Sequence, residues 1–229
     1  SKEAVLGGYV KVLHDKSFLD DPTRLFRAVR FAARFGWEIE PFTDGLMREA
    51  VKKGYVNFLS RQRIVHEFIK ILGESRPYQA LKYATEYKLA DCIFKGLKFN
   101  AKINKLKTVE ERLAYLALLQ GSCGAEFAES LLLPKKITAL SLEVLKWRKS
   151  KAAPFKALSK EALRVIKLYK PGIESFRLKP LFLCAEDLSV LGYYGPALGA
   201  ELKALAKAQY SGKVRSRRGA FSYIKKAGF

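Results

Sequence analysis

Apolar side chains recur at helical spacing along almost the whole chain, whereas strand-like alternation is confined to residues 9–13. Between residues 20 and 35, for example, Leu25, Val29 and Ala32 fall on one side of a helical wheel. Similar stripes predict further helices over 43–53, 60–72, 77–88, 123–132, 134–147, 159–169, 196–211 and 216–227. The pattern therefore predicts an all-α protein, an elongated array of small helical bundles with a short strand remnant at the N-terminus.

Start and stop signals sharpen several of these predictions. Asp21 is expected to be an N-cap with Pro22 at the first helical position, and Gly36 should end that helix. Ser60 should cap the helix that runs to residue 72, and Thr108-x-x-Glu111 reads as a capping box before an apolar run. Residues 95–107 carry five lysines and no acidic residue, so we expect a connector there.

The charge balance narrows the function. The chain has 43 Lys and Arg against 22 Asp and Glu, a formal net charge of +21, which indicates a polyanionic partner, either nucleic acid or an anionic membrane surface. The longest apolar run, of about seven residues, is too short to span a membrane, and the N-terminal residues do not resemble a signal peptide.

The few cysteines and histidines argue against disulfides, metal sites and a histidine-based catalytic triad. The three cysteines are scattered without CxxC spacing, which argues against a disulfide framework or a zinc site and favours a reducing compartment, the cytoplasm. The two histidines, His14 and His66, give little basis for a His-based metal centre or a Ser-His-Asp triad. We therefore predict that this chain holds no metal.

The helix predicted over residues 20 to 35 carries a second stripe besides its apolar one, made of Arg24, Arg27, Arg30 and Arg34. One interpretation is a solvated basic face, since arginine forms helices well. Against it, the only acidic residues that follow nearby are Glu38 and Glu40, and four guanidinium groups on one stripe repel each other unless an anion or carboxylate lies among them. The wheel alone leaves both interpretations open.

Asp21 and Arg24 also form a chemically specific pair. A carboxylate only accepts hydrogen bonds and a guanidinium only donates them. Cytosine and adenine present an amino donor next to a ring-nitrogen acceptor, whereas uracil and guanine present the reverse order. A fixed Asp21/Arg24 pair could therefore select C and A, with Arg27 and Arg30 on the triphosphate. The alternative is that Asp21 serves only as an N-cap.

Basic residues dominate the C-terminal end. From residue 202 onward there is no acid, and aromatic residues, including Tyr210, Phe221, Tyr223 and Phe229, are interleaved with the charges. This mixture suits RNA, although Tyr210 and Phe221 could instead be core positions. The predicted RNA-binding residues are Lys203, Lys207, Lys213, Arg215, Arg217, Arg218, Lys225 and Lys226. A second basic run, which could equally be a solvated face, contains Lys135, Lys136, Lys146, Arg148, Lys149 and Lys151.

The stretch FLDDPTRLFRAVRFAARFGWEIEPFT resembles the neck of class II tRNA nucleotidyltransferases, the CCA-adding enzymes and related bacterial poly(A) polymerases. In that family an E-D-x-x-R element followed by R-x-x-R-F pairs with the incoming CTP or ATP. The resemblance places this template on Asp21 and Arg24, with Arg27 and Arg30 following, and Asp20 stands where the family has Glu.

Two further segments match the same family. LSRQRIVHEFIKIL at 59–72 is similar to S-x-E-R-I-x-x-E-x-x-K-I-L, with Gln62 in place of Glu, and makes Arg63 and Glu67 supporting candidates. The alternative for this segment is an ordinary amphipathic scaffold helix. DLSVLGYYGPALGAEL at 187–202 is similar to D-L-x-x-L-G-x-x-P-G-P-x-x-G but lacks one residue before Gly195, so its turn must differ.

The resemblance implies a division into a head–neck junction remnant at 1–18, a neck at 19–94, a body at 95–180 and a tail at 181–229. The family's catalytic head holds Mg²⁺ through a D-x-D pair that this sequence lacks, so we expect the head to be removed or separately encoded and this chain alone to be inactive, with no catalytic residue. Implied substrates are CTP and ATP, and the implied partner is the acceptor stem and T arm of tRNA, with no membrane. The alternatives are a poly(A) polymerase of the same family or a non-catalytic RNA-binding helical module.

Overall fold

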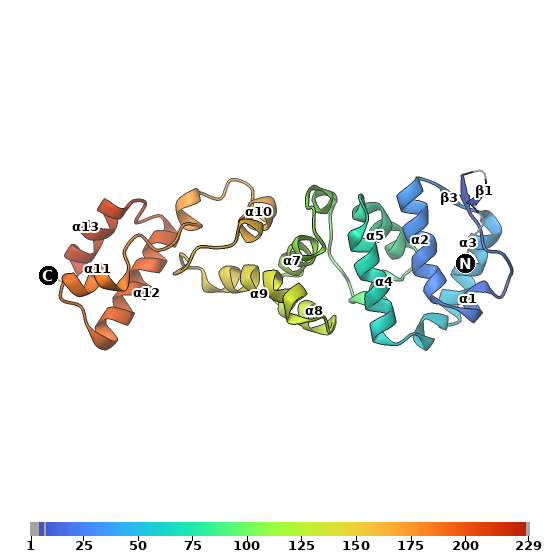
Figure 1. The fold of residues 1–229 in the computed structure, drawn as a ribbon, viewed down its shortest axis with the longest axis horizontal. Coiled ribbons are helices and arrows are strands. Elements are labelled where there is room, and N and C mark those ends of the chain that lie inside the picture. Colours follow the sequence, from blue (N-terminus) through green and yellow to red (C-terminus); the bar gives the residue numbers. More distant parts are fainter. Residues whose placement is uncertain (1–4, 7, 228–229) are drawn as a thin grey trace. The chain divides into compact units, whose positions relative to one another are not determined.

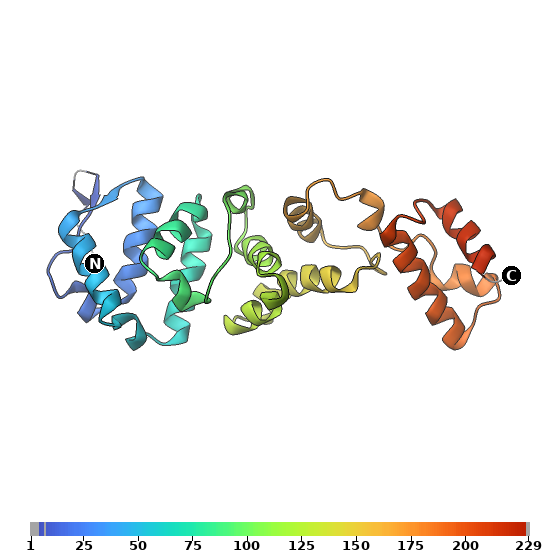
Figure 2. The ribbon, with the colours of Figure 1, turned by 180° about the vertical axis from the view of Figure 1, so that it is seen from behind.

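The computed structural model describes residues 5–6 and 8–227, and about two thirds of this part of the chain is helical (Figures 1 and 2). By its internal contacts the chain divides into two compact units, Ser1–Thr138 and Ala139–Phe229. The all-α class predicted from the apolar spacing is confirmed, since the few strand residues lie near the N-terminus.

The first unit is built from short helices. They are α1 (Ser17–Asp20), α2 (Thr23–Phe35), α3 (Pro41–Lys52), α4 (Arg61–Gly73), α5 (Pro77–Glu86), α6 (Ala90–Ile93), α7 (Val109–Leu119) and α8 (Gly124–Ser130), with the 3-10 helices η1 (Tyr55–Phe58), η2 (Ala101–Lys105) and η3 (Gly121–Cys123). Helix α2 packs against both α4 and α5. Its Leu25, Val29 and Ala32 are completely buried, as the predicted apolar stripe requires.

The second unit has its own core. Helix α9 (Lys135–Ser150) crosses the division between the units, and α10 (Lys160–Tyr169), η4 (Ser175–Arg177), α11 (Ala185–Val190), α12 (Gly195–Ser211) and α13 (Arg217–Ala227) follow it. One apolar cluster joins the last three helices; its buried members are Leu183, Leu188, Leu205, Ala208, Val214, Ala220 and Ile224. Helix α11 was not predicted from the sequence because its six residues are too few to show a helical period.

A small sheet lies beside α2. Strand β2 (Tyr9–Val10) pairs antiparallel with β1 (Val5–Leu6) and parallel with β3 (Glu38–Ile39). The alternation around residues 9–13 therefore marks a real but shorter strand. Strand β3 is formed by pairing with distant β2, and its two residues carry no pattern that could have predicted it.

Most of the predicted start signals hold, with shifted helix bounds. The N-cap position of α2 is Pro22 and not the predicted Asp21; Asp21 precedes it with an extended backbone, and its carboxylate accepts the Thr23 N–H. Gly36 ends α2 in the left-handed conformation, with φ of 67°. Helix α3 begins two residues before the predicted 43 because Glu40 accepts the Thr43 N–H. Ser60 caps α4, and the capping box of α7 is formed as predicted.

The lysine-rich stretch at 95–107 contains η2 and lies within the first unit. There the Asn104 side-chain oxygen accepts a hydrogen bond of 3.1 Å from the Tyr78 N–H. The four-part division into 1–18, 19–94, 95–180 and 181–229 stays a prediction.

Two buried or half-buried arginines serve the fold. Arg61, on α4, donates to the carbonyl oxygens of Cys92, Ile93 and Ser130 at 2.7–3.0 Å. Arg112, on α7 and 5% exposed, donates to carbonyl oxygens of the α4 C-terminus, including Leu72, and to that of Leu106. These guanidinium groups donate hydrogen bonds to backbone carbonyl oxygens where chain segments meet. Two of the positive charges therefore stabilise the fold of the first unit.

Candidate nucleotide-binding site and basic surface

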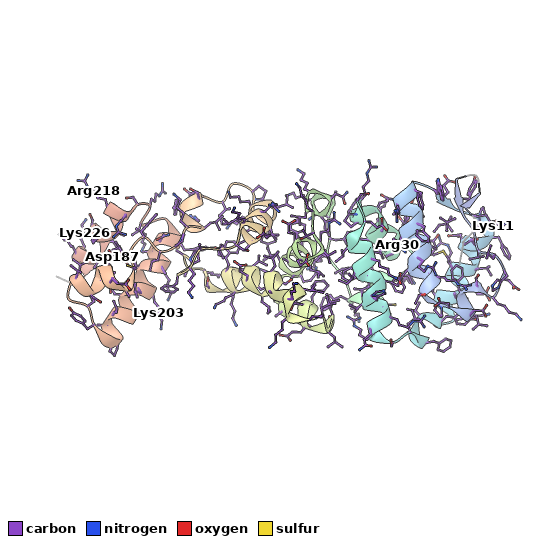
Figure 3. All side chains as sticks on the ribbon, in the orientation of Figure 1. Lys11, Arg30, Asp187, Lys203, Arg218 and Lys226 are labelled. Carbon is purple, nitrogen blue, oxygen red and sulfur yellow. The ribbon has the colours of Figure 1, made fainter. Side chains whose placement is uncertain are left out.

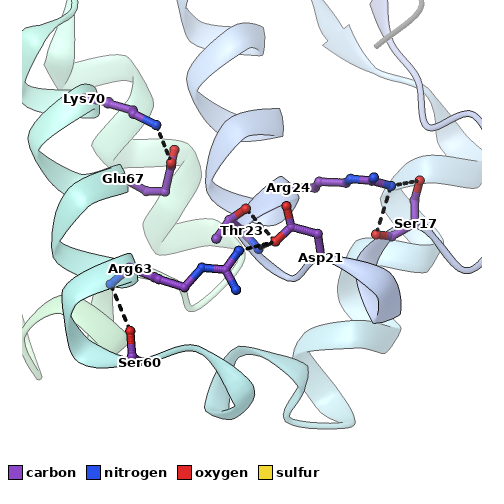
Figure 4. Close-up of polar contacts among 8 residues, drawn as sticks. All are labelled: Ser17, Asp21, Thr23, Arg24, Ser60, Arg63, Glu67 and Lys70. Atoms are coloured by element: carbon purple, nitrogen blue, oxygen red, sulfur yellow. Dashed lines mark hydrogen bonds and ion pairs between the residues drawn. The ribbon is translucent and has the colours of Figure 1, made fainter. Parts of the chain in front are cut away.

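Asp21 lies between α1 and α2 and is held by two elements. Its Oδ1 accepts hydrogen bonds from Thr23 N at 3.1 Å, Thr23 Oγ1 at 2.7 Å and Arg63 Nη2 at 3.0 Å (Figure 4). Arg63 is on α4, forty-two residues away. The predicted supporting residue Arg63 therefore contacts the predicted base-reading carboxylate directly.

Arg24 extends the other way, toward α1 (Figure 4). Its Nη1 donates to the Ser17 carbonyl oxygen at 3.3 Å and to Ser17 Oγ at 2.9 Å. Asp21 and Arg24 thus lie at the same end of α2, and each is fixed by a different partner. Ser17 was missed by sequence reasoning because a serine before the helix gives no signal of which guanidinium it will meet.

The charge state of Asp21 follows from these contacts. Burial raises the pKa of Asp21, but the hydrogen bonds from Thr23 and the charges of Arg63 and Arg24 act in the opposite direction, and the pKa lies below its usual value. The carboxylate is therefore ionised at neutral pH and acts only as an acceptor.

The arginine stripe has an acidic partner that the sequence did not reveal. Arg30 Nη1 lies 3.0 Å from Glu74 Oε1, and Arg34 Nε lies 3.8 Å from Glu74 Oε2. The side chains of Arg30 and Glu74 are only 12% and 13% exposed. Glu74 is thus a carboxylate of the kind that four neighbouring guanidinium groups require, and it comes from a distant part of the sequence because packing brings the end of α4 to α2. Arg27 is half-buried on the same helix.

The second predicted segment contributes an open hollow next to Asp21. Its volume is about 440 Å³, and it is lined by Thr23, Ser60, Gln62, Arg63, His66 and Glu67. Glu67 is 4% exposed; its Oε1 accepts from Lys70 Nζ at 2.7 Å, and its Oε2 is buried without a hydrogen-bond partner in the described part of the chain. Asp20 instead is exposed, with Oδ2 lying 3.6 Å from His14 Nε2.

The predicted RNA-binding residues of the second unit are all exposed. Figure 3 shows Lys203, Arg218 and Lys226 on this unit, together with Asp187. Arg217 Nη2 lies 2.6 Å from Asp187 Oδ1, so this cation already has a carboxylate partner. Phe221 and Tyr223 pack against the apolar cluster, as the core alternative required for Phe221. Phe229 lies outside the described residues.

The described residues show neither a cluster of metal-ligating side chains nor a helix that could span a membrane. No group of three or more His, Cys, Asp or Glu residues among positions 5–6 and 8–227 is arranged to hold a metal. Over the same positions, no helix has both the length and the apolarity to cross a bilayer.

Known proteins match both the sequence and the fold. A family model described as "Probable RNA and SrmB- binding site of polymerase A" matches residues 36–100. The A-adding tRNA nucleotidyltransferase of Geobacter sulfurreducens is 43% identical over 72 residues, which are 31% of this chain and 8% of the relative. That of Aquifex aeolicus is 28% identical over 203 residues, which are 78% of this chain and 24% of the relative.

Solved structures agree in fold. The Thermotoga maritima CCA-adding enzyme complexed with tRNA has a TM-score of 0.61 and 21% identity, covering 96% of this chain and 64% of that one. A CCA-adding enzyme with ATP has a TM-score of 0.60 and 20% identity, covering 96% and 63%. The chain thus spans about a quarter or less of the two curated relatives and under two thirds of these structures. The chain is therefore similar in sequence to A-adding tRNA nucleotidyltransferases over part of their length, and it shares its fold with CCA-adding enzymes.

Proposed function

We propose that this chain supplies the base-selecting helices and the RNA-binding half of a tRNA nucleotidyltransferase that extends the 3′ end of tRNA. The observation that carries the proposal is the ionised Asp21 carboxylate, held by Thr23 and Arg63 at the start of α2 beside Arg24. The Mg²⁺-binding carboxylates of the transfer reaction would come from a catalytic head outside this sequence, on the same protein or on a separate chain.

Base selection follows from the hydrogen-bonding capacity of the pair. Asp21 would accept from the amino group of cytosine or adenine, and Arg24 would donate to the adjacent ring nitrogen. Uracil and guanine would place a ring N–H against the guanidinium and a carbonyl against the carboxylate, which leaves buried groups unpaired. The Arg24 bonds to Ser17 use only Nη1, so the remaining N–H donors of the guanidinium are assigned to the base.

The arginines further along α2 are assigned to the phosphates of CTP or ATP. Arg27 and Arg30 follow Arg24 at successive three-residue steps, which places them along one face of the helix. In this proposal Glu74 holds Arg30 in position, and the exposed Arg34 at the far end of α2 is not required. Asp20 has no assigned contact, since its carboxylate lies beside His14.

The second unit would bind tRNA through phosphate contacts at its exposed lysines and arginines. The acceptor stem and T arm are double-stranded, so a surface of this kind would recognise shape and charge more than sequence. The same proposal puts the protein in the cytoplasm, where the free thiols of Cys92, Cys123 and Cys184 would stay reduced.

The template role is tested in the enzyme that contains both this chain and its Mg²⁺-binding head. Arg24→Ala should lower CMP and AMP incorporation into trimmed tRNA and reduce the preference over UMP and GMP by about tenfold or more, the usual effect of losing a charged hydrogen bond. Arg34→Ala is the matched control, because Arg34 lies on the same helix and is exposed. Unchanged base preference in Arg24→Ala would refute the template role.

The chain by itself should bind tRNA without transferring nucleotides, and addition of labelled CMP or AMP by the purified chain would contradict this. The description of the matching family model, which names polymerase A, favours one alternative product, a poly(A) tail. With the head present, incorporation from ATP alone into long tails would support that product over CCA addition. A purely RNA-binding module would lose affinity and show no nucleotide selectivity.

A further inference from the structure

The second unit contains a hollow that is lined by none of the eight predicted RNA-binding residues. It has a volume of about 650 Å³, is open to solvent, and is lined by Trp147, Arg148, Lys151, Tyr169, Lys170 and Tyr210. Three of these side chains are aromatic and three are basic, and no acidic side chain of the described residues lines it. The lining comes from α9, from the end of α10 and from α12, so folding of the unit is needed to assemble it.

The two tyrosine rings of the hollow lie near arginine guanidinium groups. Arg148 Cζ lies 6.0 Å from the centre of the Tyr169 ring, and Arg177 Cζ lies 5.7 Å from that of Tyr210. Both tyrosines are half-buried, so their rings are fixed against the unit and still reach its surface. Fixed rings beside cations are the arrangement that proteins use to stack unpaired bases.

Lys151 occupies an unusual backbone position at the edge of the hollow. It follows the last residue of α9 with φ of 46°, in the left-handed region that L side chains rarely adopt. A glycine would take this conformation without strain, so the turn itself does not call for lysine. Lys151 and Lys170 are both exposed and put two flexible ammonium groups at the same opening.

We propose that this hollow binds one unpaired nucleotide of the RNA, with its phosphate on Lys151 and Lys170 and its base against Tyr169 or Tyr210. The volume lies within the usual range of about 300–1,000 Å³ for small-ligand pockets. Cations alone would bind duplex and single strand alike, whereas the rings are useful only for a base that is out of the stack. The inference rests on the proposed function for its ligand, RNA, and adds a site that distinguishes an unpaired nucleotide from a duplex.

The test compares a short single-stranded oligoribonucleotide with an RNA duplex of the same length, both titrated with the full chain and followed by fluorescence anisotropy. Tyr210→Leu should weaken single-strand binding about 5-fold to 100-fold, the usual effect of losing one stacked base, and leave duplex binding unchanged. Lys151→Gly should weaken single-strand binding and lower its salt slope by about one. Because glycine relieves the left-handed strain, a loss in this variant is not attributable to misfolding.

Lys167→Ala is the matched control, since Lys167 is exposed on α10 and does not line the hollow. The inference is overturned if Tyr210→Leu and Lys151→Gly bind the single strand as the unchanged chain does, or if they lose duplex and single strand equally. Base preference in the Arg24→Ala experiment reports on the proposed function separately. If that preference changes while the hollow variants behave like the control, the site proposed here fails and the proposed function stands.

Discussion

Replacing Glu74 by alanine should show how strongly the arginine stripe depends on this distant carboxylate. Glu74 is the C-cap of α4 and pairs with Arg30 on α2, and both side chains are nearly buried. Alanine removes the carboxylate but keeps the backbone carbonyl of Glu74, which accepts from Arg112 Nη1 at 2.7 Å. The substitution therefore removes the negative charge of Glu74 and keeps its backbone contact with Arg112, while Arg30 stays buried without its carboxylate partner.

The magnitude follows from the burial of the pair. Breaking a buried ion pair by removing one partner costs about 3–5 kcal/mol, since the remaining charge stays desolvated. Arg30 and Glu74 keep 12% and 13% of their exposure, so we expect the low end, about 3 kcal/mol. The Arg34 contact adds little because Arg34 is 52% exposed and its Nε lies 3.8 Å from Glu74 Oε2. For a protein of this size, such a loss lowers Tm by about 6–12 °C.

Urea denaturation and thermal melting of the full chain give the measurement. Glu49→Ala is the matched control, because Glu49 on α3 and Lys53 just after it form an exposed pair, whose loss should change the free energy of unfolding far less. Replacing both members of the buried pair, with Arg30→Met and Glu74→Leu together, should recover most of the loss. If Glu74→Ala costs no more than Glu49→Ala, the reasoning about the buried pair is wrong.

Three further predictions concern the capping residues and the charged surface. Thr23→Val removes the 2.7 Å bond to Asp21 and should raise the pKa of that carboxylate in an NMR titration. A lowered carboxyl pKa stabilises the fold above the unfolded pKa, and this stabilisation is lost as pH falls through the folded pKa, so in the variant the stabilisation should be smaller and its loss should be complete at a higher pH. Thr108→Ala should destabilise the first unit by about 1 kcal/mol in urea, through loss of the α7 capping box, and an unchanged midpoint would contradict this. Replacing Lys203 and Lys207 by alanine should reduce the slope of log binding constant against log salt concentration for tRNA by about one for each lost phosphate contact. An unchanged slope would show that these lysines do not contact phosphates.

Local sequence determined much of the helical framework. Helical spacing placed Leu25, Val29 and Ala32 in the core, and Ser60 and Thr108 marked helix starts correctly. These features were predictable because a helix period and a cap involve residues only three or four positions apart. Helix α11 and strand β3 escaped prediction because each is too short to show a period.

The residues of the candidate site could be predicted from the sequence, but the hydrogen bonds between them could not. Asp21, Arg24 and Arg63 were identified from the sequence, but the Asp21 to Arg63 bond and the turn of Arg24 toward Ser17 were not. Each of these contacts depends on which helix packs against α2. In addition, a long side chain can adopt several rotamers, and the packing around it decides which hydrogen-bond partner it reaches.

Sequence by itself determined that this protein is helical, strongly basic and equipped with an arginine stripe on one helix, because these properties follow from residue type and local period. Tertiary structure alone decided that Glu74 neutralises part of that stripe and that Trp147, Tyr169 and Tyr210 line one hollow. Such residues are tens of positions apart, and only burial of the helix faces, driven by removal of apolar area from water, brings them into contact.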